Sequence, residues 1–94
     1  MLTLVTYDIS EDKSRTKLAK HLQNYGLHRI QYSGFTGELN PHDRILLSKE
    51  VKQYTTSETD SIYVIPLCER CYRLCKIISD RELSLKDASE IKIV

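Results

Sequence analysis

The stretch that decides the fold is the opening one, Leu2-Thr3-Leu4-Val5-Thr6-Tyr7-Asp8-Ile9-Ser10. It is rich in β-branched and apolar residues and passes directly into a charged amphipathic segment, which predicts a strand over residues 2–9. An acid at the end of a buried strand has rigid backbone behind it and solvent in front. Such a carboxylate is well placed to hold a divalent metal ion or a phosphate-bound water. Alternatively, Asp8 only ends the strand and caps the helix that follows.

Length and composition limit the class of protein. A chain of 94 residues is enough for one domain with a modest core. We expect a single domain over residues 1–94, with its core in 1–78 and a C-terminal tail in 79–94. No apolar run approaches the ~18–20 residues of a membrane-spanning helix, and no signal-peptide pattern precedes the first strand. We therefore expect a soluble, cytoplasmic protein with no membrane partner.

Charge is unevenly distributed along the chain. The 14 Lys and Arg residues nearly balance 13 Asp and Glu, for a net charge of +1. Residues 13–29 nevertheless contain no acid, and their Lys and Arg residues are Lys13, Arg15, Lys17, Lys20 and Arg29. A local basic patch of this kind can dock a phosphate backbone even on a nearly neutral protein.

Cys68, Cys71 and Cys75 lie within eight residues of one another. An odd, clustered set does not indicate a secreted disulfide framework. The Cys68-x-x-Cys71 spacing suggests zinc or redox chemistry, but zinc needs four ligands and the histidines at 21, 28 and 42 are distant in sequence. We favour a labile disulfide or two partly buried thiols.

The first half of the chain predicts a strand, a helix and an extended region. Residues 12–25 have apolar residues at helical spacing, including Leu18 and Leu22, and Gly26 follows as a stop signal. Residues 28–39 alternate as extended structure, and Gly34 and Gly37 mark a bend, bulge or hairpin within them. This region is either two short strands or one strongly kinked strand.

The second half begins with Asn40 as a helix cap and Pro41 in the first turn. The helix is expected to end near Tyr54, with an irregular apolar face formed by Ile45, Leu46, Val51 and Tyr54. A polar loop over 55–60 and a strand over 61–67 follow. Residues 72–78 are predicted as another strand, with a short helix as the alternative given the cysteine spacing. Residues 79–90 are weakly ordered or helical, and 91–94 form a short strand.

The resulting order is βαββαβ, an α+β ferredoxin-like fold with a four-stranded antiparallel sheet and two helices on one face. Such a chain leaves the other sheet face bare, and a whole apolar face is incompatible with a soluble monomer. We therefore predict a homodimer in which these faces meet and the terminal strand of each chain is exchanged onto the sheet edge of its partner.

Five short motifs in this order resemble the small CRISPR-associated "Cas-two" family, over most of residues 2–78. They are Tyr7-Asp8-Ile9, Arg15-x-Lys17-Leu18, Tyr25-Gly26, Arg29-Ile30-Gln31-Tyr32-Ser33-x-Phe35 and Ile65-Pro66-Leu67-Cys68-x-x-Cys71. The resemblance implies a ferredoxin-like homodimer that acts on nucleic acid beside the CRISPR integrase during spacer acquisition, in antiviral defence. Lys17 stands where some members carry Arg, and it lacks the guanidinium fork that holds two phosphate oxygens.

The resemblance also implies site residues. Asp8 is the metal-associated carboxylate, contributed once by each subunit across the dimer interface. Arg15, Arg29, Ser33 and Phe35 take positions needed for activity or for shaping the site, and Tyr7 neighbours them.

From the residues themselves, each of these positions has an ordinary structural alternative. Arg15 can be a solvated charge on its helix, and Arg29 can pair with an acid of the other subunit. Phe35 can be a core residue, and Ser33 can belong to a turn. Tyr7 can be packed with its hydroxyl bonded. His21 and His28 have no sequence partners, and we assign them no catalytic role.

Two functions fit these residues. In the first, paired Asp8 carboxylates hold Mg²⁺ or Mn²⁺ in a weak shared site and cleave single-stranded RNA or double-stranded DNA. In the second, the dimer is a non-catalytic adaptor that bridges integrase subunits and carries duplex DNA on Lys13, Lys17, Lys20 and neighbouring cations. An RNA-binding module of the toxin or antitoxin kind on the same fold is a third possibility.

Overall fold

The computed structural model of the chain describes residues 1–79. Its elements are β1 (Leu2–Asp8), α1 (Asp12–Asn24), β2 (His28–Gln31), β3 (Gly34–Glu38), α2 (Pro41–Glu50), the 3-10 helix η1 (Val51–Tyr54), β4 (Ser61–Leu67) and α3 (Glu69–Leu74). The four strands form one antiparallel sheet in the order β2-β3-β1-β4. The predicted α+β fold with the βαββαβ order is confirmed.

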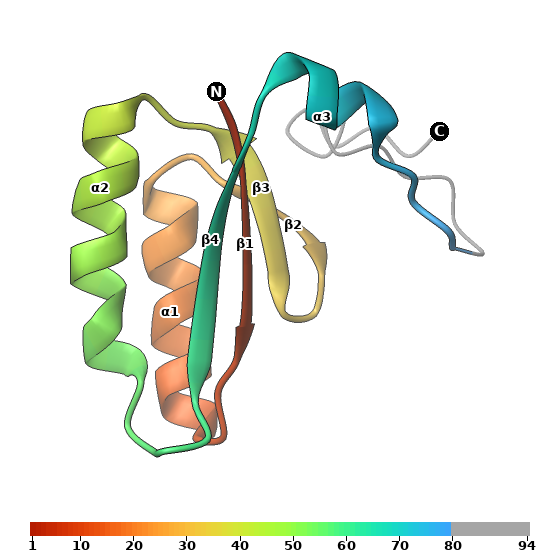
Figure 1. Cartoon of the computed structure of the whole chain (residues 1–94). Helices are drawn as coiled ribbons and strands as arrows, with labels where there is room; N and C mark the ends of the chain where they lie inside the picture. Colours follow the sequence, from red (N-terminus) through yellow and green to blue (C-terminus); the bar gives the residue numbers. More distant parts are fainter. Residues whose placement is uncertain (80–94) are drawn as a thin grey trace.

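The sheet has a helix-covered face and an open face. Figure 1 shows α1 and α2 packed side by side on one side of the sheet, whereas α3 lies beyond the end of β4. Alternate residues of β1 point to opposite faces, so Val5 and Tyr7 lie buried under the helices. Cross-strand partners share a face, and Val5 pairs with Phe35 on one side and Val64 on the other. The core therefore lies between this face and the two helices.

Helix α1 forms for the reasons that its sequence indicates. Leu18 and Leu22 are fully buried at i, i+4 spacing, and Gly26 adopts a left-handed conformation with φ of +84° immediately after the helix. The cap prediction for Asp8 is wrong, because the N-cap residue of α1 is Glu11. The Asp8 carboxylate is therefore not needed to start the helix.

A polar cluster ties α1 to the end of α2. The two ring nitrogens of His21 lie 2.9 Å from the Tyr54 hydroxyl and 2.9 Å from Glu50 Oε1, and the Tyr25 hydroxyl donates to the same Glu50 oxygen at 2.7 Å. The hydrogen bonds from Tyr25 and His21 lower the pKa of Glu50. Burial, followed by the contact with Glu50, raises the pKa of Tyr25 to about 12. His21 thus has a structural role that links the two helices.

Three further sequence predictions, for residues 28–54, can be compared with the structure. Residues 28–39 form two strands, with an irregular register between Arg29 and Gln31. Of the predicted apolar face, Val51 is buried and Tyr54 packs against the core, both within η1, whereas Ile45 and Leu46 are exposed. Within α2, Leu47 is the fully buried residue. The Asn40 cap is confirmed, because its side chain accepts the Asp43 backbone N–H at 2.7 Å.

The strand predicted over residues 72–78 is wrong, and the helical alternative is correct. The backbone N–H of Cys71 donates to Cys68 Sγ at 3.4 Å, so Cys68 caps the short helix α3. The cysteines at three- and four-residue spacing fit a helical turn better than the alternation of a strand. Predictions for residues 80–94, including the terminal strand and its exchange, lie outside the described residues.

Candidate functional site

Asp8 lies at the C-terminal end of β1 on the open face of the sheet. It is exposed, and it pairs in register with Ser61 at the start of β4. Tyr7 points to the helix side, so the neighbouring Asp8 points the other way. Within residues 1–79, no hydrogen bond or ion pair engages the Asp8 carboxylate. A carboxylate on a rigid strand end, free of capping and pairing, is available to a ligand.

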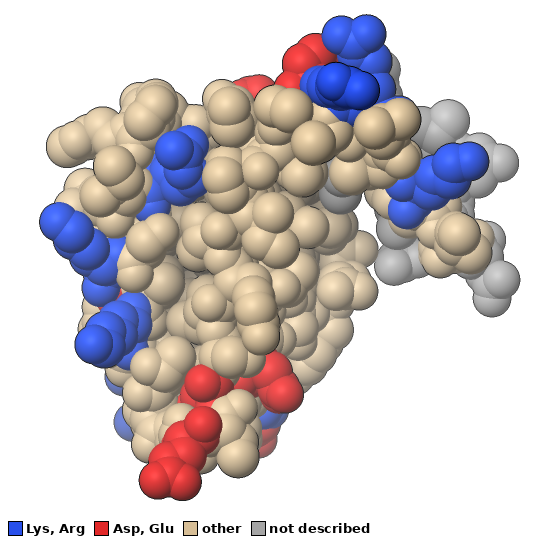
Figure 2. All heavy atoms as spheres, viewed as in Figure 1, with Lys and Arg blue, Asp and Glu red and all other residues tan. Residues whose placement is uncertain are grey.

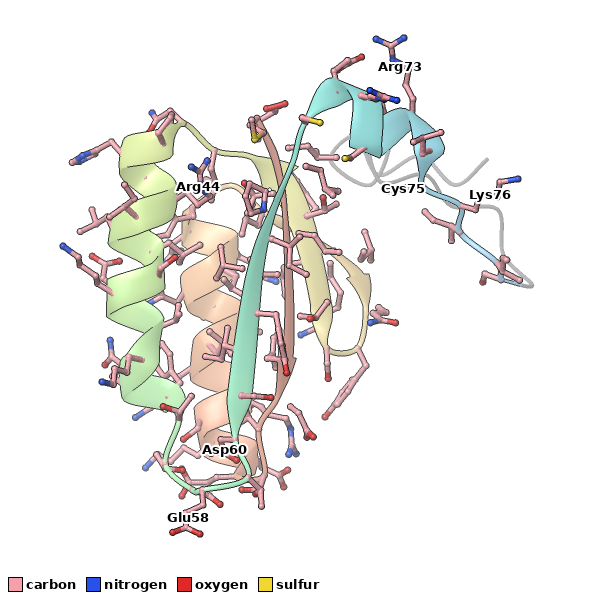
Figure 3. The ribbon with its side chains drawn as sticks, viewed as in Figure 1. Arg44, Glu58, Asp60, Arg73, Cys75 and Lys76 are labelled. Carbon is pink, nitrogen blue, oxygen red and sulfur yellow. The ribbon has the colours of Figure 1, made fainter. Side chains whose placement is uncertain are left out.

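Acidic residues dominate this end of the molecule. Figure 2 shows a group of red Asp and Glu atoms at the end where β4 begins, a smaller red group at the opposite end near α3, and blue Lys and Arg atoms down the side formed by α2. Figure 3 places Glu58 and Asp60 in the loop at this same end. A phosphate that approaches Asp8 meets negative charge, which favours a bound cation between them.

Asp60 holds the backbone around Asp8 in place. Its Oδ1 accepts hydrogen bonds from the backbone N–H and the hydroxyl of Ser10, both at 3.0 Å, and its Oδ2 accepts the backbone N–H groups of Thr56 and Ser57 at 2.9 and 3.1 Å. These bonds, led by the one from Ser10, lower the pKa of Asp60. Sequence reasoning missed Asp60, because a contact between residues 50 positions apart has no local signal.

Arg15 is anchored beside the same segment. Its Nη1 donates to the backbone carbonyls of Ile9 at 2.8 Å and Ser10 at 3.2 Å, and its Nη2 forms an ion pair with Asp12. The guanidinium therefore braces the link between β1 and α1 from the helix side. This contact makes Arg15 a positioning residue for the strand end that carries Asp8.

Tyr7, Phe35 and Arg29 form a layer on the helix side of the sheet. Phe35 is fully buried and stacks on Tyr7 with ring centroids 6.3 Å apart, so the core interpretation of Phe35 is confirmed. The guanidinium carbon of Arg29 lies 5.1 Å from the Phe35 ring centroid and 5.9 Å from that of Tyr32. The Tyr7 hydroxyl donates to the Tyr32 carbonyl at 3.4 Å, as the bonded-hydroxyl interpretation predicts.

Ser33 belongs to the turn between β2 and β3. Its carbonyl accepts the backbone N–H of Tyr7 at 3.1 Å, which extends the β1–β3 pairing by one bond. The turn interpretation of Ser33 therefore holds. The structure brings Tyr7, Arg29, Ser33 and Phe35 together and leaves Asp8 on the other side of β1.

The lysines of α1 form a stripe that points away from the sheet. Lys13, Lys17 and Lys20 are all exposed and follow i, i+4, i+7 spacing, so they share one face of the helix. Beside this stripe, a cavity of about 330 Å³ opens between α1 and the β2–β3 hairpin. Lys20, Arg15 and Arg29 border this cavity together with Tyr32, an aromatic residue that the sequence analysis did not single out.

The described residues contain no ready-made metal cluster. In residues 1–79, no group of three or more His, Cys, Asp or Glu side chains could hold a metal ion. Cys68, Cys71 and Cys75 are free and exposed, so the prediction of partly buried thiols is wrong. Nor does any helix in this part of the chain have the length and apolar character needed to cross a membrane.

Fold and site together define a class: a small ferredoxin-like α+β protein with an unpaired acid at the end of its first strand and a basic first helix. Residues 1–74 match the family model described as CRISPR associated protein Cas2, and the chain belongs to this family. The resemblance found in the sequence motifs is thereby confirmed.

Relatives and solved structures agree with this assignment. The chain is 46% identical over 94 residues to CRISPR-associated endoribonuclease Cas2 1 of Archaeoglobus fulgidus, with all of both chains covered. It is 39% identical over 67 residues to CRISPR-associated endoribonuclease Cas2 of Korarchaeum cryptofilum, which covers 71% of this chain and 72% of the relative. The crystal structure of Streptococcus pyogenes Cas2 at pH 6.5 superimposes with a TM-score of 0.70 at 27% identity, covering 84% of this chain and 100% of the other.

Proposed function

We propose that the chain is a metal-dependent endonuclease of CRISPR adaptation that works as a homodimer through Asp8 of both subunits. The observation that carries this proposal is the exposed Asp8 carboxylate, which no hydrogen bond or ion pair engages within residues 1–79. The names of the relatives support nuclease activity, because both are called CRISPR-associated endoribonucleases.

The open face of the sheet supplies the surface for a second copy. Leu4 pairs there with Ile65, and Thr6 pairs with Tyr63. Tyr63 is 60% exposed and Ile65 is 39% exposed in the single chain. Apolar side chains on an uncovered face favour burial against another such face. A two-fold axis through this face would bring two Asp8 carboxylates to one site.

The chemistry of the site suits Mg²⁺ or Mn²⁺. Carboxylate oxygens are hard ligands, and such ions keep several waters when a protein supplies only one or two carboxylates. When bound, the ion supplies an activated water and neutralises charge on the phosphate. Asp8 would hold it, and Asp60 and Arg15 would keep the strand end in position.

The remaining site residues bind and position the substrate in this proposal. The three lysines of the α1 stripe contact the phosphate backbone, and Arg29 contacts a phosphate near the cavity between α1 and the β2–β3 hairpin. Phe35 and Tyr7 support Arg29 from below, and Ser33 fixes the turn that presents it. The integrase subunit is the second expected partner of the dimer.

The test is cleavage of labelled single-stranded RNA and duplex DNA by wild type, Asp8→Asn and Glu58→Gln in Mg²⁺, Mn²⁺ or EDTA. Glu58 is an exposed acid at the same end of the molecule, so its variant controls for the general loss of negative charge. We expect Asp8→Asn to lose about 100-fold or more of the cleavage rate and Glu58→Gln to keep it. Cleavage that persists in Asp8→Asn would refute the role of Asp8, and no cleavage by wild type would refute the enzyme.

A second function, the duplex-carrying adaptor, is favoured by one observation. The lysine stripe of α1 points away from the sheet, whereas Asp8 lies on the open face. A duplex on the stripe would therefore be held without contact to Asp8. In that case Asp8→Asn leaves duplex binding unchanged, and charge reversal at Lys17 weakens it with a reduced salt dependence.

A further inference from the structure

The cavity between α1 and the β2–β3 hairpin, called the groove from here on, has the chemical character of a nucleotide site. Its volume of about 330 Å³ falls in the range of small-ligand pockets, which begins at about 300 Å³. Its polar and aromatic lining includes Tyr7, Arg15, Lys20, Gln23, Arg29 and Tyr32. Three of these carry a positive charge, and no Asp or Glu of residues 1–79 borders the groove.

Tyr32 is the aromatic surface of this groove. Tyr32 is 70% exposed, although its ring is large and apolar. The hydrogen bond from the Tyr7 hydroxyl to the Tyr32 carbonyl holds its backbone, and Arg29 lies 5.9 Å from its ring centroid. The ring is thus held at the rim of a cationic cavity with much of its surface open to solvent.

We propose that this groove binds one unpaired nucleotide of a single-stranded nucleic acid, with the base stacked on Tyr32 and the phosphate between Lys20 and Arg29. Aromatic stacking combined with a basic groove is the usual way in which proteins bind single strands. Gln23 offers both a donor and an acceptor to a base edge, so every base can find a partner. This inference rests on the proposed binding of nucleic acid and not on cleavage.

The groove selects against double strands. A base that remains paired and stacked in a duplex cannot enter a side cavity, because extrusion costs unpairing and unstacking energy. The groove also lies on the opposite side of β1 from Asp8, since Tyr7 borders it and the next residue points to the other face. It is therefore a binding subsite, and substitutions at Tyr32 and Lys20 leave the carboxylate site intact.

The experiment measures fluorescence anisotropy with a labelled, unstructured 12-nucleotide RNA, the matching DNA and the duplex, in EDTA so that cleavage plays no part. Tyr32→Ala is expected to weaken binding of both single strands about tenfold or more, with duplex binding within about twofold of wild type. Tyr32→Phe keeps the ring and is expected to bind like wild type. Thermal unfolding of each variant confirms that the protein measured is folded.

A lysine pair gives a matched control. Lys20→Ala is expected to weaken single-strand binding and to lower the salt slope by about one, whereas Lys49→Ala, on α2 and outside the groove, is expected to do neither. In addition, RNA containing 5-iodouridine is expected to crosslink on irradiation to the peptide that contains Tyr32.

Normal single-strand binding by folded Tyr32→Ala would overturn the proposal, as would an equal loss of duplex binding. Its failure can be told apart from failure of the nuclease. If binding depends on Tyr32 but the wild type cleaves nothing, the groove proposal stands and the nuclease proposal is refuted. If cleavage depends on Asp8 but Tyr32→Ala binds single strands normally, the nuclease proposal stands and the groove proposal is refuted.

Discussion

A substitution of Phe35 can test whether this residue, which the family resemblance places at the active site, contributes by packing in the core and not by contact with the substrate. It is fully buried, stacks on Tyr7 at 6.3 Å and lies 5.1 Å below the Arg29 guanidinium. In Phe35→Leu, the aromatic pair is worth about 1 kcal/mol, the cation–π contact about 0.5–1 kcal/mol, and imperfect filling of the site about 1 kcal/mol. We expect a total loss of about 2.5–3 kcal/mol in the free energy of unfolding.

This loss lowers stability without unfolding the protein. A chain of this length has a free energy of unfolding of about 5–14 kcal/mol, so the variant stays mostly folded at 25 °C. The expected fall in Tm is about 10–24 °C. It is measured by circular dichroism at one fixed protein concentration, because the proposed dimer would make Tm depend on concentration. Leu47→Ala removes a fully buried side chain of α2 at a similar cost of about 2–5 kcal/mol and serves as the control.

The decisive comparison is the RNA cleavage rate per folded molecule, well below the Tm of both variants. If Phe35 acts only by packing under Arg29, Phe35→Leu keeps the rate within about threefold, and Leu47→Ala does the same. A loss of 100-fold or more in folded Phe35→Leu alone would refute this reasoning. So would an unchanged Tm accompanied by lost activity, since Phe35 would then contact the substrate directly.

Three further predictions follow from local geometry and charge. Gly37→Ala should lower the free energy of unfolding by about 1–3 kcal/mol in a urea titration, because its Cβ would lie 2.8 Å from Leu27 Cδ2; an unchanged midpoint would contradict the packing. The backbone hydrogen bonds to Asp60 lower its pKa from the ordinary 3.8, so it stabilises the fold above about pH 4 and loses this effect as the pH falls through its folded pKa. Melts at pH 3 and pH 6 should therefore differ less for Asp60→Asn than for wild type, and equal differences would refute this. The hydrogen bond from the Cys71 N–H lowers the pKa of the Cys68 thiol, whereas the contact with Cys68 raises the pKa of Cys71. Iodoacetamide at pH 8 should accordingly modify Cys68 first in peptide mass mapping, and the opposite order would contradict the assignment.

The sequence was informative about the fold wherever the periodicity was strong. The strand at residues 2–9 and the helix with Leu18 and Leu22 were predictable because pattern, caps and stop signals agree. The face of the second helix was predicted only in part. Val51 and Tyr54 pack in the core as predicted, but Leu47 was missed, although Leu47, Val51 and Tyr54 have the i, i+4, i+7 spacing of a helix face. Adjacent apolar residues hid this spacing, since three in a row fit more than one face.

The candidate site was predictable only in its local parts. Asp8 ends one strand and Arg29 is the second residue of another, so their backbone positions could be read from the sequence. Asp60 could not be assigned, because its importance comes from contact with Ser10, which lies 50 positions away in the sequence. Tyr32 had one usable signal, an aromatic residue in a turn three positions after an arginine, but its exposure depends on the cavity beside α1.

The two sides of β1 impose a condition on any substrate that uses both proposed sites. Tyr7 borders the groove on the helix side, and Asp8 faces the open side, so a nucleic acid that contacts both must turn around the end of this strand. A single strand can make such a turn, whereas a duplex with a persistence length of about 150 base pairs resists it. A duplex is better matched to the straight lysine stripe of α1, which meets the groove only at Lys20 and lies apart from Asp8. Under these proposals, single-stranded substrates are matched to cleavage at Asp8, and duplex binding is matched to the adaptor. We therefore expect Tyr32→Ala and Asp8→Asn to affect single strands and to leave duplex binding by the lysines unchanged.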